Sequence, residues 1–188
     1  MKTIIALTFI GILTYAFAED PSDKTECKHE PMANFNPTKY LQMTPLYLTH
    51  STYESNLVIC EVMTSPTESN GNVDTNVYGY YNKSGNVYYY EIVCNTNEAS
   101  FKNGQYPNVC TIKNDTNDVQ PLISKSFDLY ISVIDTDYKN YAILYFCSNN
   151  KSGFTEYYEV FQKDLVTFND QVRGALNKMK LKLEIFTP

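Results

Sequence analysis

The sequence predicts an all-β domain: an eight-stranded antiparallel up-and-down barrel followed by one C-terminal α-helix. Three observations support this prediction. Short runs rich in Val, Ile, Tyr and Phe recur along the chain, Gly-containing turn signals separate them, and the hydrophobic period changes near the C-terminus. With 43% hydrophobic and 14% aromatic residues, the chain is too apolar to be disordered.

The β-rich runs are short and evenly spaced, as in an antiparallel sheet. Asn70-Gly71, Ser84-Gly85, Asn103-Gly104 and Ser152-Gly153 fall between runs, where hairpin turns are expected. This spacing favours a barrel or sandwich over alternating α/β units. The predicted strands are residues 46–49, 57–64, 73–81, 87–94, 106–112, 126–134, 141–148 and 157–161.

Two details favour the barrel over the sandwich. In the 126–134 run, apolar residues alternate with a mixed set, which gives the strand one apolar face. Tyr occupies both faces of the 73–81 and 87–94 runs, as expected where neither face is fully solvated. The apolar set of the 126–134 run is Phe127, Leu129, Ile131 and Val133.

The last segment has the period of an amphipathic helix. Thr167 can cap the helix, with Asp170 in its first turn, and lysines at 178, 180 and 182 suit its C-terminal end. The helix is expected to pack against the barrel through Val172, Ala175, Leu176, Met179 and Leu183.

Residues 1–18 are typical of a secretory signal peptide. Lys2 forms the positive region, residues 4–17 the apolar core, and Ala16-Phe17-Ala18 the cleavage pattern. We therefore expect a single secreted domain of residues 19–188, whose charge changes from −6 to −7 when Lys2 is removed. No second apolar run of membrane length follows, and an acidic chain without a basic face is a poor nucleic-acid binder.

A secreted chain is expected to form disulfides and to carry glycans. The five Cys residues cannot all pair within one chain, so one of them is left over. Three sequons lie in polar, turn-like stretches, and the candidate glycosylation sites are Asn82, Asn114 and Asn150.

Signals for catalysis or metal binding are weak. The chain has neither a Gly-x-Ser-x-Gly motif nor a phosphate-binding Gly-rich loop, so we expect no enzyme. His29, His50 and Glu30 are the most plausible zinc ligands, but no ligand spacing supports them, and no metal or cofactor is predicted.

One stretch resembles a known family. Within residues 132–142, Thr136-Asp137-Tyr138 followed by Tyr141-Ala142 resembles a lipocalin motif at the turn between strands six and seven. The longer stretch from Asp135 to Cys147 is similar to the triabin and pallidipin group, the salivary lipocalins of blood-feeding bugs. The opening resembles this group too, through Cys27 and the segments 34–40 and 46–51.

The resemblance implies a disulfide pattern. It pairs Cys27 with Cys147 and Cys94 with Cys110. In the family, the residue that matches Cys60 pairs with a Cys in the C-terminal tail, and residues 186–188 contain none. Cys60 is therefore the expected unpaired thiol.

The resemblance also implies an antihaemostatic function, with two modes. Some members block contact activation by engaging factor XII and kininogen; others sequester thromboxane A2 and inhibit platelet aggregation. Glu61 stands where the thromboxane binders have an anion-binding Arg, and Tyr145 replaces their Gln. We therefore predict a monomeric inhibitor of contact activation. The alternative is a scavenger of an eicosanoid or, since Glu61 suits a cation, of a biogenic amine.

A barrel of this size has room for one small ligand. Related nitric-oxide carriers hold haem through a His where this chain has Gly79, so haem is not expected. The tyrosines of two strands can line a pocket or simply pack both faces of the sheet. The pocket candidates are Tyr78, Tyr80, Tyr88, Tyr90, Glu61 and Tyr145.

Overall fold

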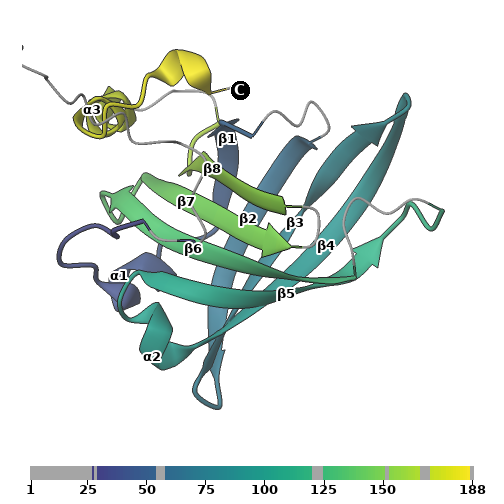
Figure 1. Cartoon of the computed structure of the whole chain (residues 1–188), viewed down its shortest axis with the longest axis horizontal. Coiled ribbons are helices and arrows are strands. Elements are labelled where there is room, and N and C mark those ends of the chain that lie inside the picture. Colours follow the sequence, from purple (N-terminus) through teal and green to yellow (C-terminus); the bar gives the residue numbers. More distant parts are fainter. Residues whose placement is uncertain are drawn as a thin grey trace, which may run out of the picture.

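The computed structural model describes residues 27, 29–53, 58–119, 125–150, 153–165 and 170–186, with backbone alone at 65–69 and 150. Eight strands form a closed barrel in which each strand is antiparallel to its neighbours and β1 pairs with β8 (Figure 1). This architecture confirms the predicted fold class. The expected signal peptide lies outside the described residues.

Each observed strand contains its predicted run and extends it, apart from small offsets at the ends. Hairpin turns lie at Gly71 and Gly85, both with positive φ. The strands are β1 (Leu46–Ser51), β2 (Val58–Ser69), β3 (Asn72–Lys83), β4 (Asn86–Asn97), β5 (Gln105–Asp115), β6 (Ser126–Thr136), β7 (Tyr141–Asn150) and β8 (Gly153–Gln162).

Two short helices at one end of the barrel were not predicted. They are α1 (Pro37–Leu41) and α2 (Glu98–Phe101), capped by the side chains of Asn36 and Asn97, and Figure 1 shows them at the same end. Tyr40 of α1 and Phe101 of α2 are almost completely buried, with ring centroids 6.2 Å apart. Their rings join the barrel core and close this end, which we call the closed end.

The Thr-Asp-Tyr segment forms the turn between β6 and β7 at the closed end. The Oδ1 atom of Asp137 accepts hydrogen bonds from the backbone N–H groups of Lys139 (2.9 Å) and Asn140 (2.7 Å). Burial acts in the opposite direction, but these bonds lower the pKa of Asp137. Tyr138 has a φ of 58°, and its hydroxyl accepts a bond from the Asn36 N–H. The motif therefore fastens the turn to the start of α1.

The C-terminal helix α3 (Asp170–Lys178) packs on the outer face of β7 and β8, but it is shorter than predicted. Lys180 adopts a φ of 59°, and the Leu181 N–H bonds to the Leu176 carbonyl (3.0 Å), which terminates the helix. Leu183 lies in a separate 3-10 turn, η1 (Leu183–Ile185), so its assignment to the helix was wrong. The proposed cap Thr167 lies outside the described residues.

Two disulfides hold the barrel. Cys27 is bonded to Cys147 on the outer face of β7, and Cys94 to Cys110 across the β4–β5 pair inside the barrel. Cys60 is an exposed free thiol. This is the pattern that the resemblance implied.

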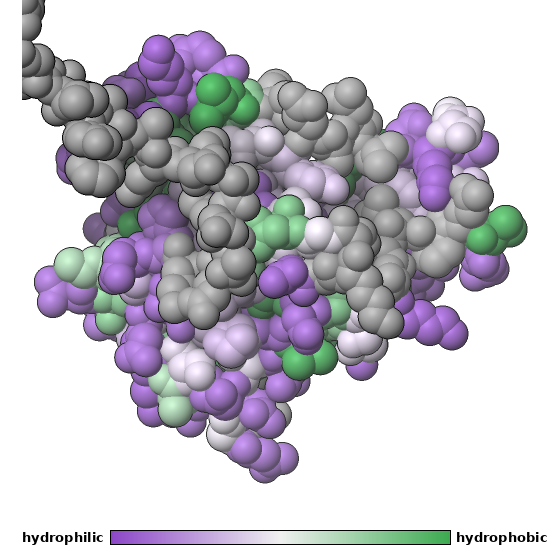
Figure 2. Space-filling view, viewed as in Figure 1, coloured by the Kyte–Doolittle hydropathy of each residue, from purple (hydrophilic) through white to green (hydrophobic). Residues whose placement is uncertain are grey.

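Figure 2 shows a largely hydrophilic face on which the hydrophobic side chains form small, separate patches. In the described part of the chain, no helix is long and apolar enough to span a membrane.

Candidate functional site

The register of β3 and β4 decides which tyrosines face the barrel interior. Gly79 pairs with Tyr90 and Tyr81 with Tyr88, so these four positions share the inner face. Tyr78 and Tyr80 alternate with them and lie on the outer face, 36% and 47% exposed. Their assignment to the pocket was wrong, because Gly79 occupies the inward position between them.

Tyr145 is also not a pocket residue. It alternates with the inward-facing Leu144 and Phe146 of β7, and it lies on the outer face beside the helix α3. Its hydroxyl donates to Glu156 (2.9 Å), and its ring packs on His29 with centroids 4.9 Å apart. Tyr145 therefore serves packing between the barrel and the segments outside it.

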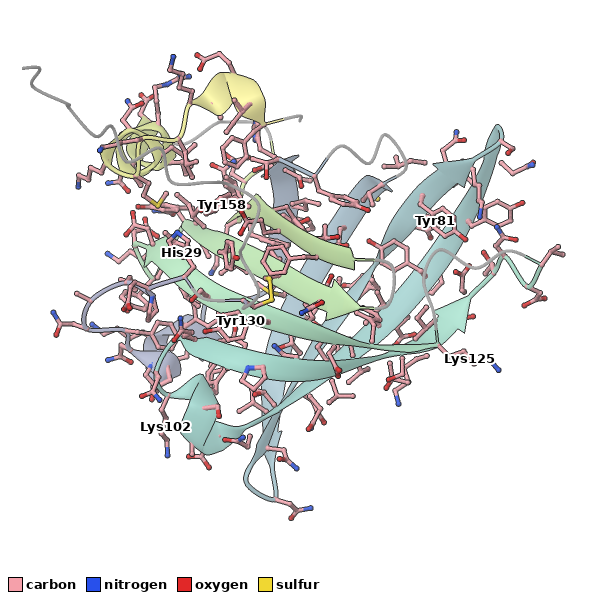
Figure 3. All side chains as sticks on the ribbon, in the orientation of Figure 1. His29, Tyr81, Lys102, Lys125, Tyr130 and Tyr158 are labelled. Atoms are coloured by element: carbon pink, nitrogen blue, oxygen red, sulfur yellow. A yellow bond between two sulfur atoms is a disulfide. The ribbon has the colours of Figure 1, made fainter. Side chains whose placement is uncertain are left out.

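The remaining candidates come together in the half of the barrel away from the closed end. Tyr81, Tyr88 and Tyr90 form a continuous inner wall, with Tyr81 5.5 Å from Tyr88 and 6.0 Å from Tyr90 between ring centroids. Figure 3 shows Tyr81 on the β3–β4 side of the barrel. The Tyr81 hydroxyl donates to Asp115 (2.9 Å), and burial, followed by this bond, raises the pKa of Tyr81 to about 12.

Glu61 of β2 faces the interior and is held by Tyr90. The Tyr90 hydroxyl donates a hydrogen bond to the Oε2 atom of Glu61. Burial raises the pKa of Glu61, and the bond from Tyr90 opposes this only in part. The pKa of Tyr90 is in turn raised far above its usual value by burial and by the adjacent carboxylate.

A second carboxyl, Glu159 of β8, lies beside Glu61. Burial and the charge of Glu61 raise the pKa of Glu159 well above its usual value, while a bond from the Ser51 hydroxyl (3.5 Å) opposes the increase. Glu159 was not predicted because β8 and β2 are far apart in sequence. They come near each other only when the barrel closes, with β1 paired between them. Its only sequence signal is an acidic residue among the apolar positions of a strand.

A cleft connects the two carboxyls to the surface. The strands β1 and β2 pair only at Leu46–Met63 and Tyr47–Val62 and separate beyond these residues. The gap holds a cleft of about 70 Å³, which we call the acidic cleft. Its walls are Leu48, Thr49, His50, Ser51, Tyr53, Val58, Ile59, Cys60, Glu61 and Glu159.

Gly79 allows β2 to reach this position. A Cβ atom at Gly79 would lie 2.1 Å from the backbone carbonyl of Cys60, well inside contact distance. The register of β2 shifts between Val58 and Cys60, where the two strands come closest. Gly79, which stands where related haem carriers have a His ligand, therefore serves to let the backbone of β2 approach β3 closely.

The histidines do not form a metal site with each other. His50 lines the acidic cleft, and burial lowers its pKa. His29 instead packs against Tyr145 and Tyr158 on the outer face (Figure 3). Within the described ranges, no group of His, Cys, Asp and Glu can hold a metal ion.

Two of the three sequon asparagines have described side chains. Asn82 is half-buried at the end of β3, where its Oδ1 atom accepts a bond from the Gly85 N–H (3.1 Å). Asn114 is exposed on β5. For Asn150 at the end of β7, only the backbone is described.

The chemistry of the acidic cleft suits a cation. Two partly buried carboxyls line the cleft together, and their pKa values are set by burial, by Tyr90 and Ser51 and, for Glu159, by the charge of Glu61. A positively charged group between them would attract both and offset one unit of negative charge. Tyr53 also lines the cleft, and its half-exposed ring, whose centroid lies 5.0 Å from that of Tyr157, supplies an aromatic surface beside the two carboxyls.

Comparisons with known proteins agree with this fold. The chain is 37% identical over 150 residues to Triafestin-2 of Triatoma infestans, covering 78% of this chain and 69% of that protein. The tryptamine complex of the amine-binding protein of Rhodnius prolixus superposes with a TM-score of 0.65 at 20% identity, covering 86% of this chain and 84% of that one. A structure of a leukotriene C4 complex superposes with a TM-score of 0.55 at 23% identity, covering 80% and 84%. The model of the Triabin family matches residues 17–172. The chain therefore belongs to the Triabin family.

Proposed function

We propose that this Triabin-family protein is a secreted antihaemostatic lipocalin that sequesters a small cationic mediator, of the biogenic amine class, in the acidic cleft. Residues 1–18 would be removed as a signal peptide, and the mature chain would act as a monomer that carries glycans. The single observation that carries the proposal is the pair of adjacent, partly buried carboxyls Glu61 and Glu159 in one cleft, for which a bound ammonium group would be the shared counterion.

The energetics of the pair support a cationic ligand. Burying a carboxylate is costly unless it is paired with a positive charge, and two adjacent carboxylates repel each other. Burial lowers the pKa of the neighbouring His50, which disfavours its charged form. An aromatic amine would place its ammonium group between the carboxyls and its ring against Tyr53. The amine-binding neighbour, which has the same fold, forms a complex with tryptamine, an aromatic amine.

The same charges oppose an anionic ligand. An eicosanoid carries a carboxylate, which Glu61 and Glu159 would repel. The fold is compatible with a leukotriene, as the structural neighbour illustrates, but the polar groups of this cleft have the opposite sign. Thromboxane A2 and other eicosanoids are therefore the less favoured small ligands.

Calorimetric titration tests the proposal. Serotonin, histamine, noradrenaline and tryptamine are titrated beside a stable thromboxane mimic. We expect stoichiometric binding of at least one amine, a loss of more than tenfold in affinity in Glu61→Gln, and a change of less than twofold in Glu91→Gln. Glu91 is the matched control, because it follows Tyr90 on β4 but lies on the outer face. Binding of the thromboxane mimic alone, or of no ligand, would reject the proposal.

A second candidate function is inhibition of contact activation through factor XII and kininogen. The identity of 37% with Triafestin-2 favours it, and the acidic chain can approach a basic partner surface through complementary charge. The test is the activated contact-phase clotting time together with binding to immobilised factor XII and kininogen. Prolonged clotting at low stoichiometry, undiminished in Glu61→Gln, would select this function over amine binding.

A further inference from the structure

A second recess lies on the outside of the barrel, away from the acidic cleft. It is a groove of about 450 Å³ that crosses the outer face from the end of β4, over β5 and β6, to the disulfide on β7. We call it the outer groove. Figure 3 shows Tyr130 of β6 next to the yellow disulfide at one end of it.

The groove exists because β4 and β5 stop pairing there. Their register ends at Asn95–Val109, and the next residues of β5 include Pro107, which has no N–H to donate. The carbonyl of Pro107 instead accepts a hydrogen bond from the Thr96 hydroxyl (2.6 Å). This side-chain bond links β4 and β5 beyond the last pair of residues in their ladder.

One side of the outer groove carries amide groups in fixed positions. The Asn95 Nδ2 group donates to Asp74 (2.6 Å), and the Asn97 Oδ1 atom accepts from the Ser100 N–H (2.7 Å). These bonds orient each amide and occupy the amino group of Asn95 and the carbonyl oxygen of Asn97. The carbonyl of Asn95 and the amino group of Asn97 have no other partner among the described residues, so one acceptor and one donor remain for a ligand. Asn72 adds a third amide to this side.

The other side of the groove is apolar. Val109 is 55% exposed, and the ring of Tyr130 lies beside the disulfide between Cys27 and Cys147. Among the lining residues there is one carboxyl, Asp128, and neither Lys nor Arg. The described part of the groove therefore offers no positive charge with which to hold a phosphate, a sulfate or a carboxylate.

We propose that the outer groove binds a neutral saccharide. A sugar ring has an apolar face of C–H groups, which suits Tyr130 and Val109, and a rim of hydroxyls, each of which both donates and accepts. Amides in fixed positions match such a rim because they also offer both functions. The volume of about 450 Å³ is that of a small-molecule site rather than a protein interface. The site is separate from the acidic cleft, so it would let the protein attach to a glycan while the cleft binds its own ligand.

An array of neutral and sulfated oligosaccharides, probed with the full mature chain after enzymatic removal of its own N-glycans, tests this proposal. Hits are confirmed by titration with NMR detection. We expect at least one neutral oligosaccharide to bind and to shift the amide signals of residues 95–97, 108–109 and 128–130, while those of Glu61 and Glu159 stay unchanged. Binding of heparin alone, shifts confined to the acidic cleft, or no binding at millimolar concentration would overturn the proposal.

Paired variants locate the site. Asn149→Lys places a long side chain at the β7 end of the outer groove and should weaken saccharide binding at least tenfold. Asn86→Lys makes the same change in charge at an exposed position in the β3–β4 hairpin and should alter binding by less than twofold. Both positions are exposed, so both variants should fold, which thermal melting checks. Equal loss of binding in the two variants would contradict the assignment of the site.

Discussion

Replacing Glu159 by Gln should stabilise the ligand-free protein at neutral pH. The change removes a partly buried carboxyl whose pKa is raised by desolvation and by Glu61, and it keeps an oxygen that can accept the bond from Ser51. A carboxyl with a raised pKa in the folded state adds stability below its unfolded pKa, and this stability is lost as the pH rises through the folded pKa. At pH 7.5 the native Glu159 is therefore a cost that the amide lacks.

The magnitude follows from the link between pKa and free energy. An increase of one in the pKa of a carboxyl corresponds to about 1.4 kcal/mol at a pH above both values. A domain of this size gains about 2–4 °C in Tm per kcal/mol. We therefore expect Glu159→Gln to raise the Tm by about 3 °C or more at pH 7.5. The difference should become small near pH 4, where the native carboxyl is largely protonated in both states.

Differential scanning calorimetry of both proteins between pH 4 and pH 8 measures the effect. Glu91→Gln, on the outer face, should change the Tm by less than about 1 °C at every pH, as surface substitutions usually do. A Glu159→Gln protein that is less stable than the native chain at pH 7.5, or a gain that is the same at pH 4, would refute the reasoning. Either result would mean that the Glu159 carboxylate is solvated or already paired.

Three other predictions follow from the same structure. The affinity for an amine should rise with pH, by up to tenfold per pH unit for each proton that binding expels, and calorimetry in buffers of different ionisation enthalpy should detect those protons; a pH-independent affinity would contradict this. Gly79→Ala should destabilise the fold by about 1–3 kcal/mol, because the new Cβ would meet the Cys60 carbonyl. Gly174→Ala in α3, where a Cβ would meet open space, should stabilise the fold by about 0.5–1 kcal/mol. Urea unfolding of the two variants and the native chain measures both changes. The double variant Cys94→Ala, Cys110→Ala should lose about 3 kcal/mol in the same assay, as expected for a loop of this length, and an unchanged midpoint would show that the disulfide adds nothing.

The fold was predictable because its signals are local. Alternation of apolar and polar residues identifies a strand, and the face of Phe127, Leu129, Ile131 and Val133 that alternation predicts is the face that packs inside the barrel. The short helices α1 and α2 gave no such signal. Each has only one turn or slightly more, and each is held by an Asn cap and by one aromatic ring buried against other segments. Helices of this length depend on tertiary contacts that no window of sequence contains.

The site was harder to predict because alternation does not say which face is inside. In the 73–81 run both faces carry Tyr, so the sequence pattern fits Tyr78 and Tyr80 inside as well as it fits Tyr81 inside. The deciding residue is Gly79, whose missing side chain is required by the approach of the Cys60 carbonyl. Tyr145 failed for a different reason. It is buried as expected, but beneath α3 on the outer face rather than in the interior.

The position of the acid pair also explains why the cleft opens where it does. The β1–β2 edge has two paired positions, whereas every other neighbouring pair of strands forms a longer ladder within the described ranges. If β1 and β2 paired along their full length, no gap would remain through which water or a ligand could reach Glu61 and Glu159. By separating above Tyr47, the two strands leave a route by which a cation can reach the carboxyls. The strand pair with the fewest paired residues and the two adjacent carboxyls therefore lie at the same place in the barrel. A positively charged ligand bound there would offset part of the negative charge of Glu61 and Glu159.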